Sequence, residues 1–294
     1  MPHLRRIQNI APESVLVLAG GRAILLQLAN PAVGHGVARH SDFAARPLDR
    51  LNGSLAYVYA VTCGTIDDRA AAVRRVAAAH RPVHGPAGSS SPAYNAFDPQ
   101  LQLWVAATLY ESATRMHDLV FGPLADDDAE AVYRDYGVLG TALQVPPELW
   151  PADREAFDAY WRREVAALST DATTRAVADQ LLHPRSGPFW LRPAMPLARL
   201  LTTGLLEPGE RALFELPFPR GRQRRFEQVV CLIRLIYPRL PRRLRHAPMR
   251  HYLRVGRAAA GGHGGIGPYG IGPDGVGPLE EVVGRARGAG DREG

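Results

Sequence analysis

Hydrophobic residues recur along most of the chain at the spacing of an amphipathic helix. One such helix is predicted over 69–80, because the acidic pair Asp67 and Asp68 before it suits the positive end of a helix dipole. Its apolar stripe is spaced i, i+3, i+4 and i+7 and consists of Val73, Val76, Ala77 and His80. Asp98-Pro99 starts another helix, since proline is tolerated in the first turn. The stripe of that helix contains Leu101, Val105, Thr108, Leu109 and Ser112.

Helical periodicity fits most of the remaining chain as well. The further predicted helices are 15–29, 49–61, 126–144, 153–168, 170–182 and 222–237. Few segments alternate polar and apolar residues with period two, so short strands are not expected. The pattern therefore predicts a mainly α fold with a single multi-helix domain over 1–257.

Glycine and proline interrupt the helical pattern in two places. Residues 82–92 read as an exposed loop. The second interruption is the C-terminal stretch 258–294, where a Gly-x-Gly-Pro motif recurs every five residues from Gly265 to Pro278. This composition cannot form a packed core, so a disordered tail is predicted.

The overall composition is that of an ordinary globular protein, with 46% hydrophobic and 22% charged residues. A disordered, collagen-like or coiled-coil chain is thereby excluded. The longest apolar stretch, 15–29, is interrupted by Gly20-Gly21-Arg22 and falls short of the roughly 20 residues that span a bilayer. The first residues lack the pattern of a signal peptide, so the expected compartment is the cytoplasm.

Positive charge is concentrated near the end of the predicted domain. The chain has no lysine, and its 35 basic residues are all arginines. Twelve of them lie between Arg220 and Arg257, beside a single acidic residue, Glu227. Such a cluster suits an anionic partner, either a membrane surface or nucleic acid, but it also fits a solvated face. Apolar residues between the arginines favour peripheral contact with an anionic membrane over nucleic acid.

Familiar catalytic motifs are missing, so the candidate chemistry rests on single side chains. Cys63 and Cys231 have no metal-binding spacing and are expected to be free thiols. His80 lies on the apolar face of its helix, which by itself favours a hydrogen-bonded core histidine over a metal ligand. His84 follows one turn later, but Pro82 should distort a helix between the two, so a His-x-x-x-His metal pair is disfavoured.

Arg50 and Ser54 form a second candidate pair. Residues four apart share a helix face, so the guanidinium and the hydroxyl can point at one spot and bind an anion or a polarised oxygen. An exposed arginine and a serine at a helix start would give the same pattern.

Several segments together resemble the MpaB / rubber oxygenase catalytic-domain family, over about residues 10–245. Their order and spacing carry the resemblance, since each motif is weak alone. The matching segments are 20–31 (GGRAILLQLANP), 37–43 (VARHSDF), Arg50-Leu51 with Ser54, 57–61 (YVYAV), Gly64-Thr65, 75–85 (RVAAAHRPVHG), 98–101 (DPQL) and 103–109 (LWVAATL).

The resemblance implies a mainly α, haem b-binding oxygenase that acts on an apolar small molecule, possible classes being isoprenoid or polyketide-like. It implies that His80 is the proximal iron ligand. It also implies that Arg50 and Ser54 line the distal side, where serine replaces the usual threonine and both can donate hydrogen bonds to dioxygen or a haem propionate. The helices 15–29 and 101–109 would line an apolar pocket.

Two positions depart from the relatives. Latex-clearing relatives carry a lysine where this chain has Gly53, and many relatives carry a histidine where it has Ala106. No distal carboxylate base aligns, and His40 is the nearest upstream titratable candidate for a catalytic role.

Three functions remain open at this point. The first is a haem b-dependent oxygenase, the second a haem protein with another role. The third is a haem-free helical binding protein whose arginine-rich segment docks on anionic membrane or nucleic acid.

Overall fold

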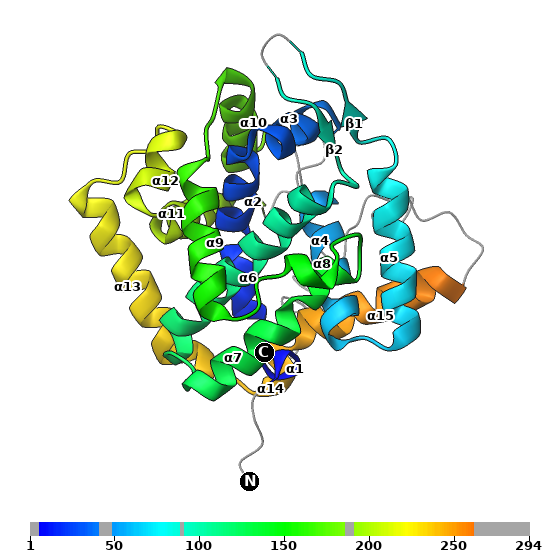
Figure 1. Ribbon diagram of the computed structural model, residues 1–294. Helices are drawn as coiled ribbons and strands as arrows, with labels where there is room; N and C mark the ends of the chain where they lie inside the picture. Colours follow the sequence, from blue (N-terminus) through cyan, green and yellow to red (C-terminus); the bar gives the residue numbers. More distant parts are fainter. Residues whose placement is uncertain (1–5, 41–48, 89–90, 186–190, 262–294) are drawn as a thin grey trace.

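The computed structural model describes residues 6–40, 49–88, 91–185 and 191–261, which form a single helical domain (Figure 1). The predicted mainly α fold is confirmed. The first half contains the helices α1 (Ile7–Ile10), η1 (Ser14–Ala19, 3₁₀), α2 (Gly20–Ala29), α3 (Pro31–His40), α4 (Asp49–Cys63), α5 (Ile66–His80), α6 (Pro99–Phe121), α7 (Asp126–Tyr136) and α8 (Val138–Thr141). The second half contains η2 (Pro147–Leu149), α9 (Arg154–Ala166), α10 (Ala172–Leu182), α11 (Leu191–Leu205), α12 (Pro208–Leu213), α13 (Arg220–Ile236), η3 (Tyr237–Arg239), α14 (Arg242–Arg245) and α15 (Ala247–Gly261).

Helix α6 runs through the middle of the domain (Figure 1). It begins as the Asp98-Pro99 signal predicts, because the Asp98 carboxylate accepts hydrogen bonds from the amides of Gln100 (2.8 Å) and Leu101 (3.2 Å). It ends at Gly122, whose φ of 85° suits glycine. Trp104 and Met116 on this helix are fully buried, each in a different hydrophobic cluster. The helix is therefore the common wall of more than one core.

The remaining helices lie on opposite sides of α6. Helices α5 and α15 lie on one side, and α11, α12 and α13 lie on the other (Figure 1). Helix α4 packs against α5 and α15. On the other side, buried residues of α6 and α11 meet Phe226 of α13, so α13 is attached to the domain by one face. Helix α15 extends to Gly261, past position 258 where the tail was predicted to begin; the predicted tail from 262 onward lies outside the described residues.

Two short strands correct the expectation that strands are absent. β1 (His84–Gly85) pairs antiparallel with β2 (Tyr94–Asn95), and His84 lies opposite Asn95. Strands of two residues are too short to show period-two alternation, so local sequence patterns contain no signal for them. Helix α5 ends at His80, and His84 lies in β1. The two histidines therefore do not share a helix face, as a helical His-x-x-x-His metal pair would require.

The predicted helix 126–144 is also corrected, because it divides into α7 and α8 at Gly137. A Cβ atom at Gly137 would lie 3.1 Å from the Trp150 ring, so this glycine permits a close approach. Gly21 of the Gly20-Gly21-Arg22 motif has a similar role, since a Cβ atom there would collide with Thr202 of α11. The glycine lets α2 and α11 pack closely.

The described helices were compared with the length and apolarity that a bilayer requires. None of them meets the requirement by itself. The segments Ser14–Ala29 and Pro31–His40 meet it together, but they are bent by 106° where they join.

Candidate functional site

A cavity of about 580 Å³ lies among α3, α4, α5, α6 and α15. Its wall is mainly aliphatic, and this volume falls within the range typical of small-molecule sites. The aliphatic side chains include Val33, Val37, Val76, Val105, Leu109 and Leu143. Helix α6 lines the cavity as the sequence predicts, but α2 contributes only Gln27. The prediction that residues 15–29 form a wall was therefore wrong, because Leu25, Leu26 and Leu28 pack into a separate core with α10.

Three of the predicted site residues line this one cavity. His80 comes from the end of α5, Ser54 from the second turn of α4, and His40 from the end of α3. Ser54 and His40 are exposed, whereas His80 is half-buried. Arg50 lies one turn before Ser54 in α4, but its side chain is outside the described part of the structure. The tertiary structure thus gathers side chains that are 14 to 40 positions apart along the chain.

His80 lies on the cavity side of α5 together with Val76. Its imidazole ring packs edge-on against Phe97, with 6.2 Å between the ring centroids and an interplanar angle of 83°. This contact restrains the imidazole ring at the cavity wall. The prediction from periodicity that His80 points inward with Val76 is confirmed.

His40 lies at the solvent side of the cavity and contacts Tyr94 of β2. The His40 Nε2 and the Tyr94 hydroxyl are 3.2 Å apart and share a hydrogen bond, and the two rings meet edge-to-face. The Arg39 guanidinium lies over the Tyr94 ring, 5.7 Å from its centroid. The hairpin between β1 and β2 therefore positions His40, although the sequence analysis expected only a loop there.

Arg75 and Gln27 also line the cavity, and the sequence analysis missed both. The Arg75 Nη1 atom is 3.5 Å from the carbonyl oxygen of Gly256, and burial lowers the pKa of Arg75, as does neighbouring Arg74. A guanidinium that is partly desolvated would gain from a bound anion. Gln27 donates from Nε2 to the Thr108 hydroxyl at 3.0 Å, and Thr108 donates to the Val105 carbonyl oxygen at 2.7 Å. Gln27 belongs to the segment 20–31 that carries the family resemblance, and this was the one feature of the sequence that could have indicated a role for it.

Helix α15 closes one side of the cavity with Tyr252, Val255, Gly256 and Ala259. The Tyr252 hydroxyl donates to Asn52 Oδ1 at 2.6 Å, and both residues are buried. Further along α15, the guanidinium of Arg257 binds the carboxylate of Asp68 on α5, with Nη2 2.7 Å from Oδ2. Part of the arginine-rich segment is therefore a wall of the cavity, which local sequence patterns did not indicate.

We expect Asp68→Asn to loosen α15 from α5. The hydrogen bond from Arg257 is the main reason that the pKa of Asp68 falls from an ordinary 3.8 to about 2. Since this folded pKa lies below the unfolded one, the stabilisation is present above about pH 4 and is lost as the pH falls toward 2. Hydrogen exchange at neutral pH should become several-fold faster in 247–261. The control Asp67→Asn, at an exposed acid in the same turn, should leave exchange there unchanged.

The two departures from the relatives both lie in the cavity wall. Gly53 and Ala106, the positions where the resemblance implies lysine and histidine, both line the cavity. Their small side chains add no titratable group to its wall. The roles that lysine and histidine would have at these positions are not available here.

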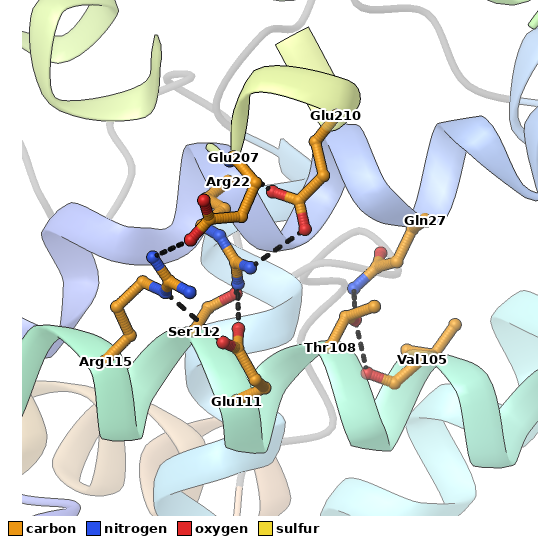
Figure 2. Close-up of polar contacts among 9 residues, drawn as sticks. All are labelled: Arg22, Gln27, Val105, Thr108, Glu111, Ser112, Arg115, Glu207 and Glu210. Atoms are coloured by element: carbon orange, nitrogen blue, oxygen red, sulfur yellow. Dashed lines mark hydrogen bonds and ion pairs between the residues drawn. The ribbon is translucent and has the colours of Figure 1, made fainter. Parts of the chain in front are cut away.

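A buried ionic network lies beside the cavity and joins α2, α6 and α12 (Figure 2). Arg22 is fully buried and binds Glu111, the Ser112 hydroxyl (3.0 Å) and Glu210 Oε1 (3.1 Å). Arg115 extends the network from Glu111 to Glu207 (Figure 2). The network lies one to two helical turns from the Gln27–Thr108 contact on the same two helices. It therefore fixes the distance between α2 and α6 next to the site.

The sequence of this chain matches one protein family and two curated relatives. Residues 7–235 match the family described as "ER-bound oxygenase mpaB/B'/Rubber oxygenase, catalytic domain". Uncharacterised proteins of Mycobacterium bovis and Mycobacterium tuberculosis are each 41% identical to this chain over 225 residues, which is 75% of this chain and 88% of each relative. No solved structure matches the chain. The matched region contains α1 to α12 and most of α13, including His40, Ser54 and His80. The chain therefore belongs to the mpaB/rubber oxygenase catalytic-domain family.

Proposed function

We propose that this protein is a haem b-dependent oxygenase that acts on an apolar small molecule. One observation carries the proposal: His80 lies in the wall of an aliphatic cavity that Ser54 and His40 also line. The family is that of an oxygenase catalytic domain, which supports the reaction class.

The side chains of the cavity fit a haem. Because the porphyrin supplies the equatorial ligands, haem iron needs few ligands from the protein, and an imidazole such as that of His80 is a common one. Within the described residues, no group of three or more histidine, cysteine, aspartate or glutamate side chains could hold a bare metal ion. Aliphatic walls suit the porphyrin faces, and the partly desolvated Arg75 suits a propionate. In this assignment His80 and Arg75 would hold the cofactor.

The remaining cavity residues would bind and orient the reactants. Bound haem would supply the redox chemistry that activates dioxygen. Ser54 can donate a hydrogen bond from its hydroxyl into the cavity, and Arg50 is the proposed second donor on the same helix. His40 can exchange a proton at the solvent side, where Tyr94 orients its ring. The aliphatic wall would exclude water from the reacting groups.

The substrate class follows from the same wall. None of the described residues that line the cavity is acidic, and Arg75 is the single arginine among them. Aliphatic side chains offer contact area but few hydrogen bonds, so a hydrocarbon-rich substrate is favoured over a sugar or a nucleotide. An isoprenoid chain is the first candidate to test.

Titration of the purified protein with haemin tests the proposal directly. We expect saturable binding of one haem per chain and a Soret band typical of histidine-ligated iron. Ala106→Phe should weaken binding, because it fills the cavity without removing a polar group, and far-ultraviolet circular dichroism should show unchanged helix content. Absence of a Soret band after reconstitution of the folded protein would refute haem dependence. If the Soret band is present, dioxygen uptake by the haem-loaded protein on addition of a short isoprenoid would support the proposed substrate class.

A further inference from the structure

Helix α13 presents a row of apolar side chains to solvent. Leu232 and Leu235 are each 55% exposed, and Ile236 is 48% exposed. These residues are spaced i, i+3 and i+4, so they share one face of the helix. Phe226 and Ile233 pack into the domain instead. The exposed row is therefore distinct from the residues that pack α13 against the rest of the domain.

The apolar row continues onto neighbouring segments. A groove of about 370 Å³ is lined by Leu18 of η1 together with Leu232, Ile236 and Leu240. Leu18 and Leu240 are exposed as well. We call these residues the apolar face; it consists of Leu18, Leu232, Leu235, Ile236 and Leu240. A contiguous apolar surface drawn from two separate segments is typical of an interaction site.

Exposed arginines surround the apolar face. Arg225 lies seven positions before Leu232, two helical turns away on the same face of α13, and Arg239 follows the helix in η3. Both arginines are exposed. The segment 220–257 contains twelve arginines and one acidic residue, Glu227. Arg245 pairs with Glu13 and Arg257 with Asp68, so most of the positive charge of the segment remains. The surface is therefore both apolar and strongly cationic.

We propose that the apolar face and its arginines dock on an anionic lipid bilayer. Leucine and isoleucine side chains would enter the boundary between headgroups and acyl chains, and the arginines would meet the lipid phosphates. Nucleic acid would satisfy the arginines but would leave the aliphatic row exposed to water. A second copy of this chain on the same face would bring two sets of arginines together, which repel each other. A bilayer with anionic headgroups satisfies both kinds of side chain.

Vesicle sedimentation of the full chain tests this proposal. We expect binding to vesicles of phosphatidylcholine mixed with phosphatidylglycerol, little binding to phosphatidylcholine alone, and weaker binding as salt is added. The triple variant Leu232→Ser, Leu235→Ser, Ile236→Ser should bind at least about tenfold more weakly, since each apolar side chain loses its burial in lipid. Because these side chains are exposed, helix content by circular dichroism should not change.

A pair of matched substitutions separates this surface from general positive charge. Arg225→Gln should weaken vesicle binding about fivefold, as expected for one exposed basic residue on the face that meets an anionic surface. Arg162→Gln, at an exposed arginine of α9, should have no effect. Three results would overturn the proposal: no binding at low salt, equal loss from both arginine substitutions, or full binding by the triple variant. Tighter binding to a DNA duplex than to vesicles would identify nucleic acid as the partner instead. A dimer of the unaltered protein that is absent from the triple variant would identify a second copy of this chain as the partner.

Discussion

Replacing His80 by alanine should strip the protein of haem while leaving its helices in place. His80 is the last residue of α5, half-buried at the cavity wall, so the substitution removes a side chain without interrupting the helix. Loss of a residue that merely supports a metal ligand costs about 10- to 100-fold in affinity. Loss of the ligand itself should therefore cost more than about 100-fold. The measurement is a haemin titration followed at the Soret band, with helix content from circular dichroism.

His84→Ala is the matched control for this prediction. His84 is four positions away but exposed in β1, and it does not line the cavity, so its loss should leave haem affinity unchanged. Added imidazole should restore a histidine-like spectrum to the His80→Ala protein, because it can occupy the space that the side chain leaves. If the His80→Ala protein retained haem fully, with an unchanged absorption spectrum, another residue would be the iron ligand.

Replacing Arg22 by methionine should lower the free energy of unfolding by about 3–5 kcal/mol, the usual cost of removing one partner from a buried ion pair. Arg22 is 0% exposed and Glu210 is 3% exposed, so the carboxylate that remains cannot be solvated. The Trp161 ring also loses a cation–π contact with the guanidinium. Urea unfolding monitored by circular dichroism measures the difference.

The pH dependence and a control variant identify the cause of this loss. Burial raises the pKa of Glu210, whereas Arg22 lowers it, so the substitution should raise the pKa further. A carboxyl group with a raised folded pKa is most stable when protonated, and the deficit of the variant should therefore shrink as the pH falls. Arg115→Met removes a partly exposed arginine from the same network and should cost at most about 1 kcal/mol. Similar losses from both substitutions would contradict a buried-charge origin.

Local sequence patterns predicted α5, α6, α9, α10 and α13 to within a few residues, because helix formation depends on residues three and four positions apart. They did not predict α3, α11, α12 or α15, and the single helix predicted over 15–29 is a 3₁₀ segment followed by α2. The Asp98-Pro99 start of α6 was confirmed, as was the inward orientation of Val76 and His80 on α5. The division of 126–144 at Gly137 was missed; at this glycine a Cβ atom would lie 3.1 Å from the Trp150 ring, a close approach that no local pattern shows. The β1–β2 pair was missed for the same reason, because its hydrogen bonds join residues about ten positions apart.

The candidate site was predictable only in part. His40, Ser54 and His80 could be proposed through the family resemblance, and they do line one cavity. Arg75 was missed because it lies outside the apolar stripe predicted for its helix. The α15 wall was missed because a cationic segment gives no indication of which of its residues turn toward a cavity. Likewise, the sequence placed apolar residues among the arginines of 220–257, but it did not distinguish the buried Phe226 from the exposed Leu232.

The sequence by itself determined the helical class, the starts of helices such as α6 and α7, and the cavity-facing positions Val76 and His80 of α5, because these depend on side chains within one or two turns. The tertiary structure alone decided which helices meet around the cavity, that Arg22 is buried against Glu111 and Glu210, and that α15 covers the cavity while α13 exposes leucines. These features arise from contacts between residues up to about 200 positions apart, such as Asn52 with Tyr252. Burial is a property of such contacts, and no local pattern contains it.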